Sequence, residues 1–458
     1  MKKIINYIAA VGMIMSAVSC SFTDLEPTDK VGDKEIFSSV TTLEQALTGT
    51  YSKMSMKTTI SVSAVLSDDV YKGGQNGGAG DDSYQWTYSA STGDHNTLWS
   101  SYYSVISMAN RVINGSVGIT PADDSEAKTK NNCIGSALFI RAYTYFDLLR
   151  FFSDYEKNDS YGIPYSKETV VLETLGRNSV AECFAAIKKD LETAIPLLVQ
   201  VTPDDPAYAS QAAAKALLAR VYLYERNYDK AYEYASAVLA QNPIAAMNEY
   251  GALWTDESNK EVLFELKKLS GEETIGTIFF SADNSSSFEP STELINSFDE
   301  DDIRLQIFIG DGVDRDGVAV KRVNKYKGTA ENVGLADQKM LRSSEMLLIM
   351  AEAKAHTDLA EGNKLLNQLR AARIEGWESK DYTTEEVLLN EILLERRREL
   401  CYEGHRFFDM RRFNLPIYKP MIDKTLDIND HHRIQPIPLS EMQGNPVKIG
   451  RASCRERV

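Results

Sequence analysis

Apolar residues recur at helical spacing along most of the chain. Residues 97–115 carry them every three or four positions, which predicts an amphipathic helix. Residues 134–152 are apolar on nearly every side, which predicts a helix buried on several faces. Ser179 and Glu182 have the spacing of a capping box, which predicts the start of a further helix that runs to about Leu198.

The most specific helical pattern covers residues 212–243. Its spacing matches the tetratricopeptide unit, in which small residues let two helices pack closely. The positions that carry the match are Leu218, Ala219, Tyr222, Tyr228, Ala231 and Pro243. A generic helical hairpin is the alternative interpretation. A looser helical pair is predicted at 340–374, and one more helix at about 384–403.

Two segments interrupt the helical pattern. Residues 57–96 are rich in Gly, Ser, Asp and aromatic residues, and residues 251–335 mix turn clusters with strand-like runs at 262–266 and 277–280. Long irregular insertions are usually functional or disordered, and the aromatic content here favours function. The predicted fold class is all-α dominated, a tetratricopeptide-like helical repeat scaffold with long irregular loops and a few short strands. Residues 36–446 are predicted to form a single domain.

The two ends of the chain differ from this domain. Residues 1–19 join Lys2 and Lys3 to a short apolar run, the pattern of a secretory signal. Because the run ends in small residues before Cys20, as in a lipobox, we expect a lipoprotein signal, lipid on Cys20, and an acidic tether over 20–35. An ordinary signal peptide is the alternative. The basic tail, 447–458, is hypothesised to be foreign to the domain, and an intact mass of the native protein that includes it would refute this.

Charge and cysteine content exclude several classes of protein. The net charge of −16 argues against a nucleic-acid partner, because binding phosphates needs a basic face. The cysteines form no C-x-x-C pair, which argues against a disulfide framework and against a zinc site. Cys133, Cys183 and Cys401 lie in helical apolar patterns and are expected to be small buried side chains.

Motifs for catalysis are missing from the sequence. It contains no H-E-x-x-H pair, no G-x-S-x-G elbow and no phosphate-binding G-x-x-x-x-G-K loop. We therefore predict no catalytic residues, no metal site and no enzymatic activity. Residues 311–317 weakly resemble a calcium loop but lack its regular spacing and its final glutamate. Calcium is thus the only cofactor left open, with a solvated turn as the alternative.

Ordered sequence blocks along nearly the whole chain resemble the SusD/RagB family. They lie at 44–51, 98–113, 141–148, 162–164, 217–223, 342–353, 367–370, 395–412 and 435–441. The strongest is Glu395–Arg412, which reads ERRRELCYEGHRFFDMRR. Five charged residues in it recur at steps of three or four and predict a structural network of opposite charges on one helix. They are Glu399, Glu403, Arg406, Asp409 and Arg412.

The resemblance also implies where a ligand would bind. A sugar ring stacks its apolar face on aromatic rings and bonds its hydroxyls to polar groups. Family members place binding aromatics on loops such as 68–96. The candidate ligand-binding residues are Asp69, Tyr71, Asn76, Tyr84, Trp86 and Tyr88, with Trp254 and Phe288 on an opposite wall. For each ring the alternative is that it pins the loop onto the helices, and Trp99 is expected to be a core residue.

The function implied by the resemblance is nutrient capture at the cell surface. A member of this family is expected to be a lipid-anchored outer-membrane protein that faces the cell exterior. It binds an oligosaccharide and passes it to a SusC-like TonB-dependent transporter, without breaking bonds. Three alternatives stay open: an oligopeptide carrier of the same transport system, a surface glycosidase, and a helical scaffold that lacks a ligand pocket.

Overall fold

The computed structural model describes residues 36–445, apart from 75, 169–174, 201–204, 273, 282, 284 and 315. The signal segment, Cys20, the tether and the tail at 447–458 lie outside the described residues. Within the described part, no helix has the length and apolar character that crossing a membrane requires.

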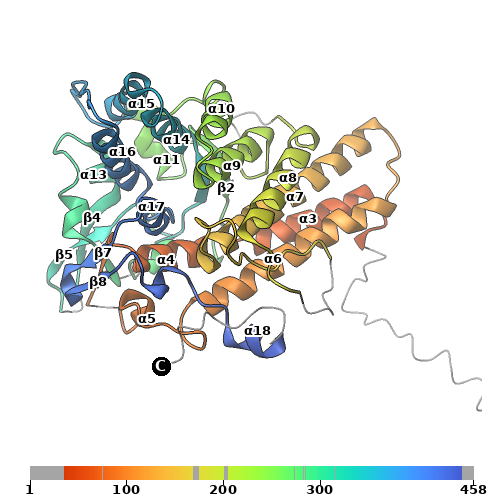
Figure 1. Cartoon of the computed structure of the whole chain (residues 1–458), viewed down its shortest axis with the longest axis horizontal. Helices are drawn as coiled ribbons and strands as arrows, with labels where there is room; N and C mark the ends of the chain where they lie inside the picture. The colour runs from red at the N-terminus through yellow and green to blue at the C-terminus, as the bar shows by residue number, and fades with distance from the viewer. Residues whose placement is uncertain are drawn as a thin grey trace, which may run out of the picture.

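Long helices lie side by side in one half of the molecule (Figure 1). They are α3 (Val40–Lys53), α6 (His95–Gly115), α7 (Asp124–Phe152) and α8 (Val180–Ala194). The capping box predicted at Ser179 is confirmed at the start of α8. The Ser179 side chain accepts a hydrogen bond from the N–H of Glu182, and the Glu182 side chain accepts one from the N–H of Ser179. Pro196 falls in the short 3₁₀ turn that follows α8, where a missing N–H is tolerated. Trp99 is buried against Phe152, as expected of a core residue.

The tetratricopeptide-like pair is confirmed as α9 (Gln211–Tyr224) and α10 (Tyr228–Leu239). Ala219 and Ala231 are fully buried, so the two helices approach closely. Tyr222 stacks on Tyr234 with ring centroids 5.6 Å apart, whereas Tyr228 turns to the next helical pair and stacks on His356. That pair, α14 (Ser343–Ala355) and α15 (Leu359–Ala371), is followed by α16 (Glu385–Leu400), as the sequence predicts.

The strands are short and pair only in twos within the described residues. β1 (Val70–Lys72) pairs with β3 (Phe288–Pro290), and β2 (Val262–Leu266) pairs with β6 (Gln338–Arg342). β4 (Ile309–Val313) and β5 (Ala319–Val323) form one hairpin, and β7 (Ile417–Lys419) and β8 (Lys424–Leu426) form another. All pairs are antiparallel. The fold is therefore all-α dominated, and the strand predicted at 262–266 is confirmed.

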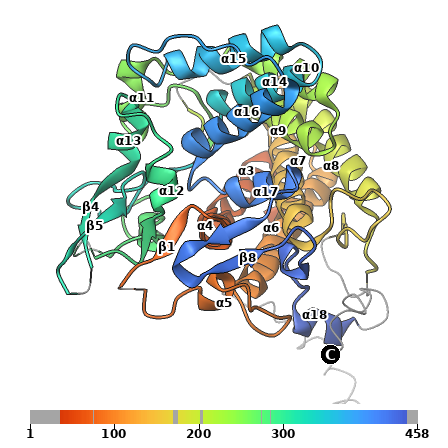
Figure 2. The same ribbon diagram turned by 60° about the vertical axis from the view of Figure 1, so that its left-hand side comes forward.

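Short helices complete the chain between and after these elements. They are α4 (Lys57–Leu66), α5 (Asp81–Tyr84), α11 (Met247–Leu253), α12 (Thr292–Ile295), α13 (Ile303–Phe308), α17 (Arg406–Arg412) and α18 (Leu439–Gly444). Figure 2 shows the β4–β5 hairpin and α18 on opposite sides of the molecule.

Two local predictions were wrong. Residues 57–66, expected to be irregular, form helix α4. Its Val62–Leu66 stretch is buried on every side, so it shows no amphipathic stripe that a periodicity argument could detect. Residues 277–280, expected to be a strand, begin inside a 3₁₀ turn at Gly276–Ile278. Gly276 packs directly against the backbone of the loop that carries Tyr326 and Gly334, which fixes this turn from a distance.

The charged block at 395–412 does not form one helix. Helix α16 ends at Leu400, and a turn with Tyr402 and Gly404 in the left-handed region separates it from α17. The predicted network of opposite charges along a single helix is therefore wrong in geometry. The side chains are paired and buried, but their main partners come from distant elements, because the turn points successive side chains into different parts of the core.

The three described cysteines meet the expectation for small core side chains. Cys133, Cys183 and Cys401 are free and buried. Burial raises the pKa of Cys133 and of Cys401 to about 12, so both thiols stay protonated near neutral pH.

Candidate functional site

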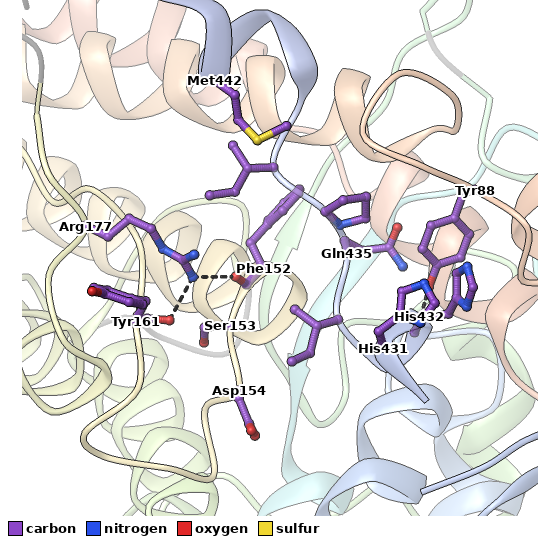
Figure 3. Close-up of a pocket in the computed structure, with 13 residues that line it drawn as sticks. Tyr88, Phe152, Ser153, Asp154, Tyr161, Arg177, His431, His432, Gln435 and Met442 are labelled. Carbon is purple, nitrogen blue, oxygen red and sulfur yellow. Dashed lines mark hydrogen bonds between the residues drawn. The ribbon is translucent and has the colours of Figure 1, made fainter. Parts of the chain in front are cut away.

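A surface cavity of about 220 Å³ lies where the C-terminal segment crosses the end of α7 (Figure 3). Its lining combines aromatic, aliphatic and polar side chains. The residues are Tyr88, Phe152, Ser153, Asp154, Tyr161, Arg177, His431, His432, Ile434, Gln435, Pro436, Ile437 and Met442. We call it the Tyr161 pocket, because Tyr161 is the most exposed aromatic ring among them, with 71 % of its surface accessible.

Arg177 fixes one wall of the Tyr161 pocket. Its guanidinium donates hydrogen bonds to the carbonyl oxygens of Phe152, Tyr161 and Gly162, at 3.2, 2.8 and 2.7 Å. It also lies 5.5 Å from the centroid of the Tyr161 ring. Burial lowers the pKa of Arg177, although the group remains a cation at neutral pH. The carbonyls hold the arginine in place, so its charge and the exposed ring form a preorganised pair.

The opposite wall comes from Tyr88 and the C-terminal segment. The Tyr88 hydroxyl donates to the carbonyl oxygen of His432, and the two rings meet edge to face with centroids 5.1 Å apart. Burial raises the pKa of this hydroxyl far above its usual range, so it stays a donor. Gln435 lies beside it, and its buried amide nitrogen has no partner of good hydrogen-bond geometry in the described structure. The Gln435 side chain also pulls the pKa of the Tyr88 hydroxyl down, so the two side chains interact within this wall.

The pocket suits one ring of a polar, partly apolar ligand. Its volume is below the roughly 300–1,000 Å³ of typical small-molecule sites, so a longer ligand would extend into solvent. Phe152, Ile434 and Ile437 supply apolar surface, while Arg177 supplies donors. Such a set is suited to hold and orient a polar ligand.

Most of the ligand-binding residues predicted from the sequence are buried in this structure. Tyr84 and Trp86 enclose the ammonium of Lys419, which lies 4.3 Å from the centroid of each ring. Lys419 also donates to the carbonyls of Val65 and Tyr84, and burial lowers its pKa well below the usual value. The indole N–H of Trp86 donates to the Leu66 carbonyl. These contacts fasten the loop onto the helices.

The remaining buried candidates do not line the Tyr161 pocket. The Asp69 carboxylate accepts from Arg397 at 2.8 Å, and Asn76 accepts from the N–H of Gly78 within its own turn. Trp254 packs edge-on against Phe308 and 4.2 Å from the ammonium of Lys325, and Phe288 is a buried residue of β3. The structure does not bring Trp254 and Phe288 to the Tyr161 pocket, so of the predicted residues only Tyr88 lines it.

Tyr71 is the predicted residue that stays partly exposed outside the pocket. Its hydroxyl donates to Glu293, and burial together with this carboxylate raises its pKa to about 12. Tyr418, half exposed on the β7–β8 hairpin, donates to Asp423 at 3.1 Å. The Glu293 carboxylate contributes to raising the pKa of Tyr418 as well, which places the two tyrosines on one surface. This is a second, flatter aromatic surface, distinct from the pocket.

The segment with weak calcium-loop character is the turn of the β4–β5 hairpin. The Asp314 carboxylate accepts from the N–H groups of Asp316 and Val318, and Asp311 pairs with Lys321 across the strands. These carboxylates already have partners typical of a solvated turn.

Sequence reasoning missed Tyr161, Arg177 and the 431–442 segment. Tyr161 sits beside a Gly-Ile-Pro turn that was read only as a family block, and nothing local distinguishes Arg177 from other surface arginines. A tyrosine next to a predicted turn is the one sequence signal that could have indicated an exposed ring here.

Comparison with known proteins gives a consistent picture. A family model described as "Starch-binding associating with outer membrane" matches residues 21–223, and one described as "SusD family" matches residues 310–447. The chain is 25% identical to SusD-like protein P2 of Formosa agariphila over 88% of the chain and 89% of that protein. It is also 25% identical to a SusD-like protein of Bacteroides ovatus, over 90% and 82%.

Solved structures with the same architecture extend the likeness. A SusD superfamily protein of Bacteroides thetaiotaomicron superposes with a TM-score of 0.80 at 25% identity, over 90% of this chain and 99% of that one. A protein of Bacteroides vulgatus described as "Putative sugar binding protein" superposes with a TM-score of 0.75 at 29% identity, over 89% and 97%.

Proposed function

The chain belongs to the SusD/RagB family, and from that premise we propose that it binds carbohydrate at the cell surface through the Tyr161 pocket. The matched model carries a starch-binding, outer-membrane description, and one structural relative is described as sugar-binding. Tyr161 carries the proposal, because it is an exposed ring held beside an arginine that three backbone carbonyls fix in place.

The chemistry of the pocket matches that of a sugar. A pyranose offers an apolar face to an aromatic ring and hydroxyls to planar donors. Tyr161 offers the ring, and Arg177 offers the donors. The predicted loop residues Tyr84 and Trp86 support the pocket indirectly, because they fasten the segment that carries Tyr88. A ligand of several sugar units would place one ring in the pocket and the others across the surface.

Capture is proposed to serve import. The protein would be held at the outer membrane by lipid on Cys20 and would pass the oligosaccharide to a SusC-like TonB-dependent transporter. No step breaks a bond, so the protein acts as a receptor and not as an enzyme. The family membership and the signal-like N-terminus support this arrangement.

Calorimetry with the chain from residue 21 onward tests the proposal. A panel of oligosaccharides and oligopeptides is titrated into the wild type and into Tyr161→Ala. We expect at least one glycan to bind and its affinity to fall about 3- to 10-fold in the variant, the value of one lost aromatic stack. The matched control is Tyr208→Ala, which removes a half-exposed tyrosine outside the pocket lining.

Each outcome has a separate meaning. Glycan binding that is unchanged in Tyr161→Ala but lost in Tyr71→Ala or Tyr418→Ala would refute the pocket and move the site to the second aromatic surface. Binding of peptides alone would favour the oligopeptide carrier. Release of a reducing sugar end from a bound glycan would contradict the receptor and favour a glycosidase.

A further inference from the structure

Two histidines and a carboxylate converge at the edge of the Tyr161 pocket. Asp430, His431 and His432 are consecutive, and each offers one ligand atom such that all three atoms lie within 4.8 Å of one another. The same oxygen of Asp430 lies 2.8 Å from Nδ1 of His432 and 3.5 Å from Nδ1 of His431. We propose that these three side chains bind one divalent transition-metal ion of the Zn²⁺ class.

The distances fit a single ion. A tetrahedral zinc ion with bonds of about 2.0–2.2 Å holds neighbouring ligand atoms roughly 3.3–3.5 Å apart. Of the two Asp430–imidazole separations, 3.5 Å matches this spacing and 2.8 Å is shorter, so a small side-chain rotation completes the geometry. Two imidazoles and one carboxylate form a donor set that suits zinc and neighbouring transition metals better than calcium or magnesium.

The surrounding structure holds this turn in place. The Asp430 carboxylate accepts the backbone N–H of His432 at 2.9 Å, which fixes the turn that presents both rings. Tyr88 donates to the His432 carbonyl and packs its ring against the imidazole. The neighbouring Arg433 points elsewhere, because its guanidinium donates to the carbonyls of Leu415 and Met410. The turn is thus fixed before an ion arrives, as at sites whose ligands are oriented by outer contacts.

The placement of the rings points to a metal more than to a hydrogen-bonded pair. The two imidazole centroids lie 3.8 Å apart, and both rings approach one carboxylate oxygen. That oxygen is 2.8 Å from Nδ1 of His432 but 3.5 Å from Nδ1 of His431, so only the contact with His432 has the length of a good hydrogen bond. The His431 side chain is exposed, and its contacts are the Asp430 oxygen 3.5 Å from its Nδ1 and the neighbouring His432 ring. An ion between the three groups would satisfy all of them at once.

The ion would have a free coordination position beside the cavity. Both histidines line the Tyr161 pocket, as Figure 3 shows next to Tyr88. Three protein ligands leave a zinc ion one position for water or for an oxygen of a bound molecule. The metal proposal does not depend on carbohydrate binding, since it is tested without any sugar.

Titration of ZnCl₂ into the full chain, after removal of metal with a chelator, tests this proposal. A competing chromophoric chelator reports the affinity, and Co²⁺ in place of Zn²⁺ reports the geometry by its visible absorption. We expect one ion per chain and an absorption typical of tetrahedral Co²⁺. The His431→Ala variant should bind at least tenfold more weakly, and the double variant His431→Ala/His432→Ala should lose the site.

His356→Ala is the matched control, because it removes another histidine paired with a carboxylate, Glu385, at 2.7 Å. It should leave the affinity unchanged. Since His431 is exposed, its single variant should fold like the wild type, and its melting temperature verifies this. Wild-type binding of less than one ion, or equal binding in His431→Ala and His356→Ala, would overturn the proposal.

Discussion

Replacement of Glu399 by glutamine should destabilise the protein more than any surface charge change. Glu399 lies within a group of fully buried charges that we call the buried ionic cluster. Its cations are Lys325, Arg304, Arg342, Arg370 and Arg373, and its anions are Glu261, Asp302, Glu395, Glu399 and Glu403. The two sets are equal in number, so the cluster is neutral as it stands.

The magnitude follows from the contacts of Glu399. Its carboxylate accepts from Arg342 at 2.9 Å, from Arg304 and Arg373 at 3.1 Å each, and from the Tyr250 hydroxyl at 2.9 Å. One pair of unit charges about 4 Å apart is worth about 4 kcal/mol at an effective dielectric constant of 20. Glutamine keeps the shape but removes the charge, so one cation becomes uncompensated. Breaking a buried pair in this way costs about 3–5 kcal/mol.

Thermal unfolding measures this loss. At roughly 2 °C per kcal/mol for a large domain, Glu399→Gln should lower the melting temperature by about 6–10 °C. The control is Glu233→Gln, whose pairing with Lys230 is exposed and should leave the melting temperature unchanged. If the two variants melt within about 2 °C of each other, the reasoning on the buried ionic cluster is wrong.

Three further perturbations test other parts of the structure. Burial raises the pKa of Glu265 to about 7, against the pull of Lys339. The folded state therefore favours the protonated carboxyl, and the stability this provides is full below pH 4.5 and is lost as the pH rises through 7. In urea unfolding, Glu265→Gln should lose less stability than the wild type between about pH 5 and 8, and equal losses would refute this. Trp86→Ala should cost about 3–5 kcal/mol in thermal unfolding, because it empties a buried site, and an unchanged melting temperature would show that the ring is not core. Gly276→Ala should lower the melting temperature, since an added Cβ would collide with facing backbone; a fully stable variant would contradict the packing of that turn.

Acid should affect the buried ionic cluster only at low pH. Burial raises the pKa of Glu395, but Arg304 and Arg370 outweigh it and bring the pKa to about 2, below the usual 4.5. A depressed pKa gives stability that is present above 4.5 and disappears as the pH falls towards 2. The cluster therefore keeps its full contribution through the mildly acidic range.

Local patterns were sufficient for most of the long helices and insufficient for the site. The α9–α10 pair follows from Ala219, Ala231 and their neighbours, because helix packing is encoded at spacings of three and four. Helix α4 escaped detection, since a helix buried on every side has no polar face. The short strands were found only where a continuous apolar run coincided with one, as at 262–266.

The position of the aromatic rings could not be read from the sequence. Trp86 was expected to face a ligand because it lies in a polar, glycine-rich loop. It is buried because Lys419, more than 300 residues further along the chain, lies against its ring. The Tyr161 pocket likewise joins three distant segments, around Phe152, Arg177 and His432. Such contacts depend on the folded arrangement and leave no spacing in the sequence.

The strongest sequence block explains why the two irregular regions are mostly scaffold. Arg397 and Arg406 bind Asp68 and Asp69 at the base of the first region, and Glu403 binds Lys325 in the second. The turn between α16 and α17 thus fastens both regions onto the helices through buried charges. Because these regions are held by charge pairs and their large rings are covered, most of their aromatic residues stabilise the fold. Tyr71 in the first region stays partly exposed and Tyr161, outside both regions, is exposed, which is why the calorimetric variants compare those two.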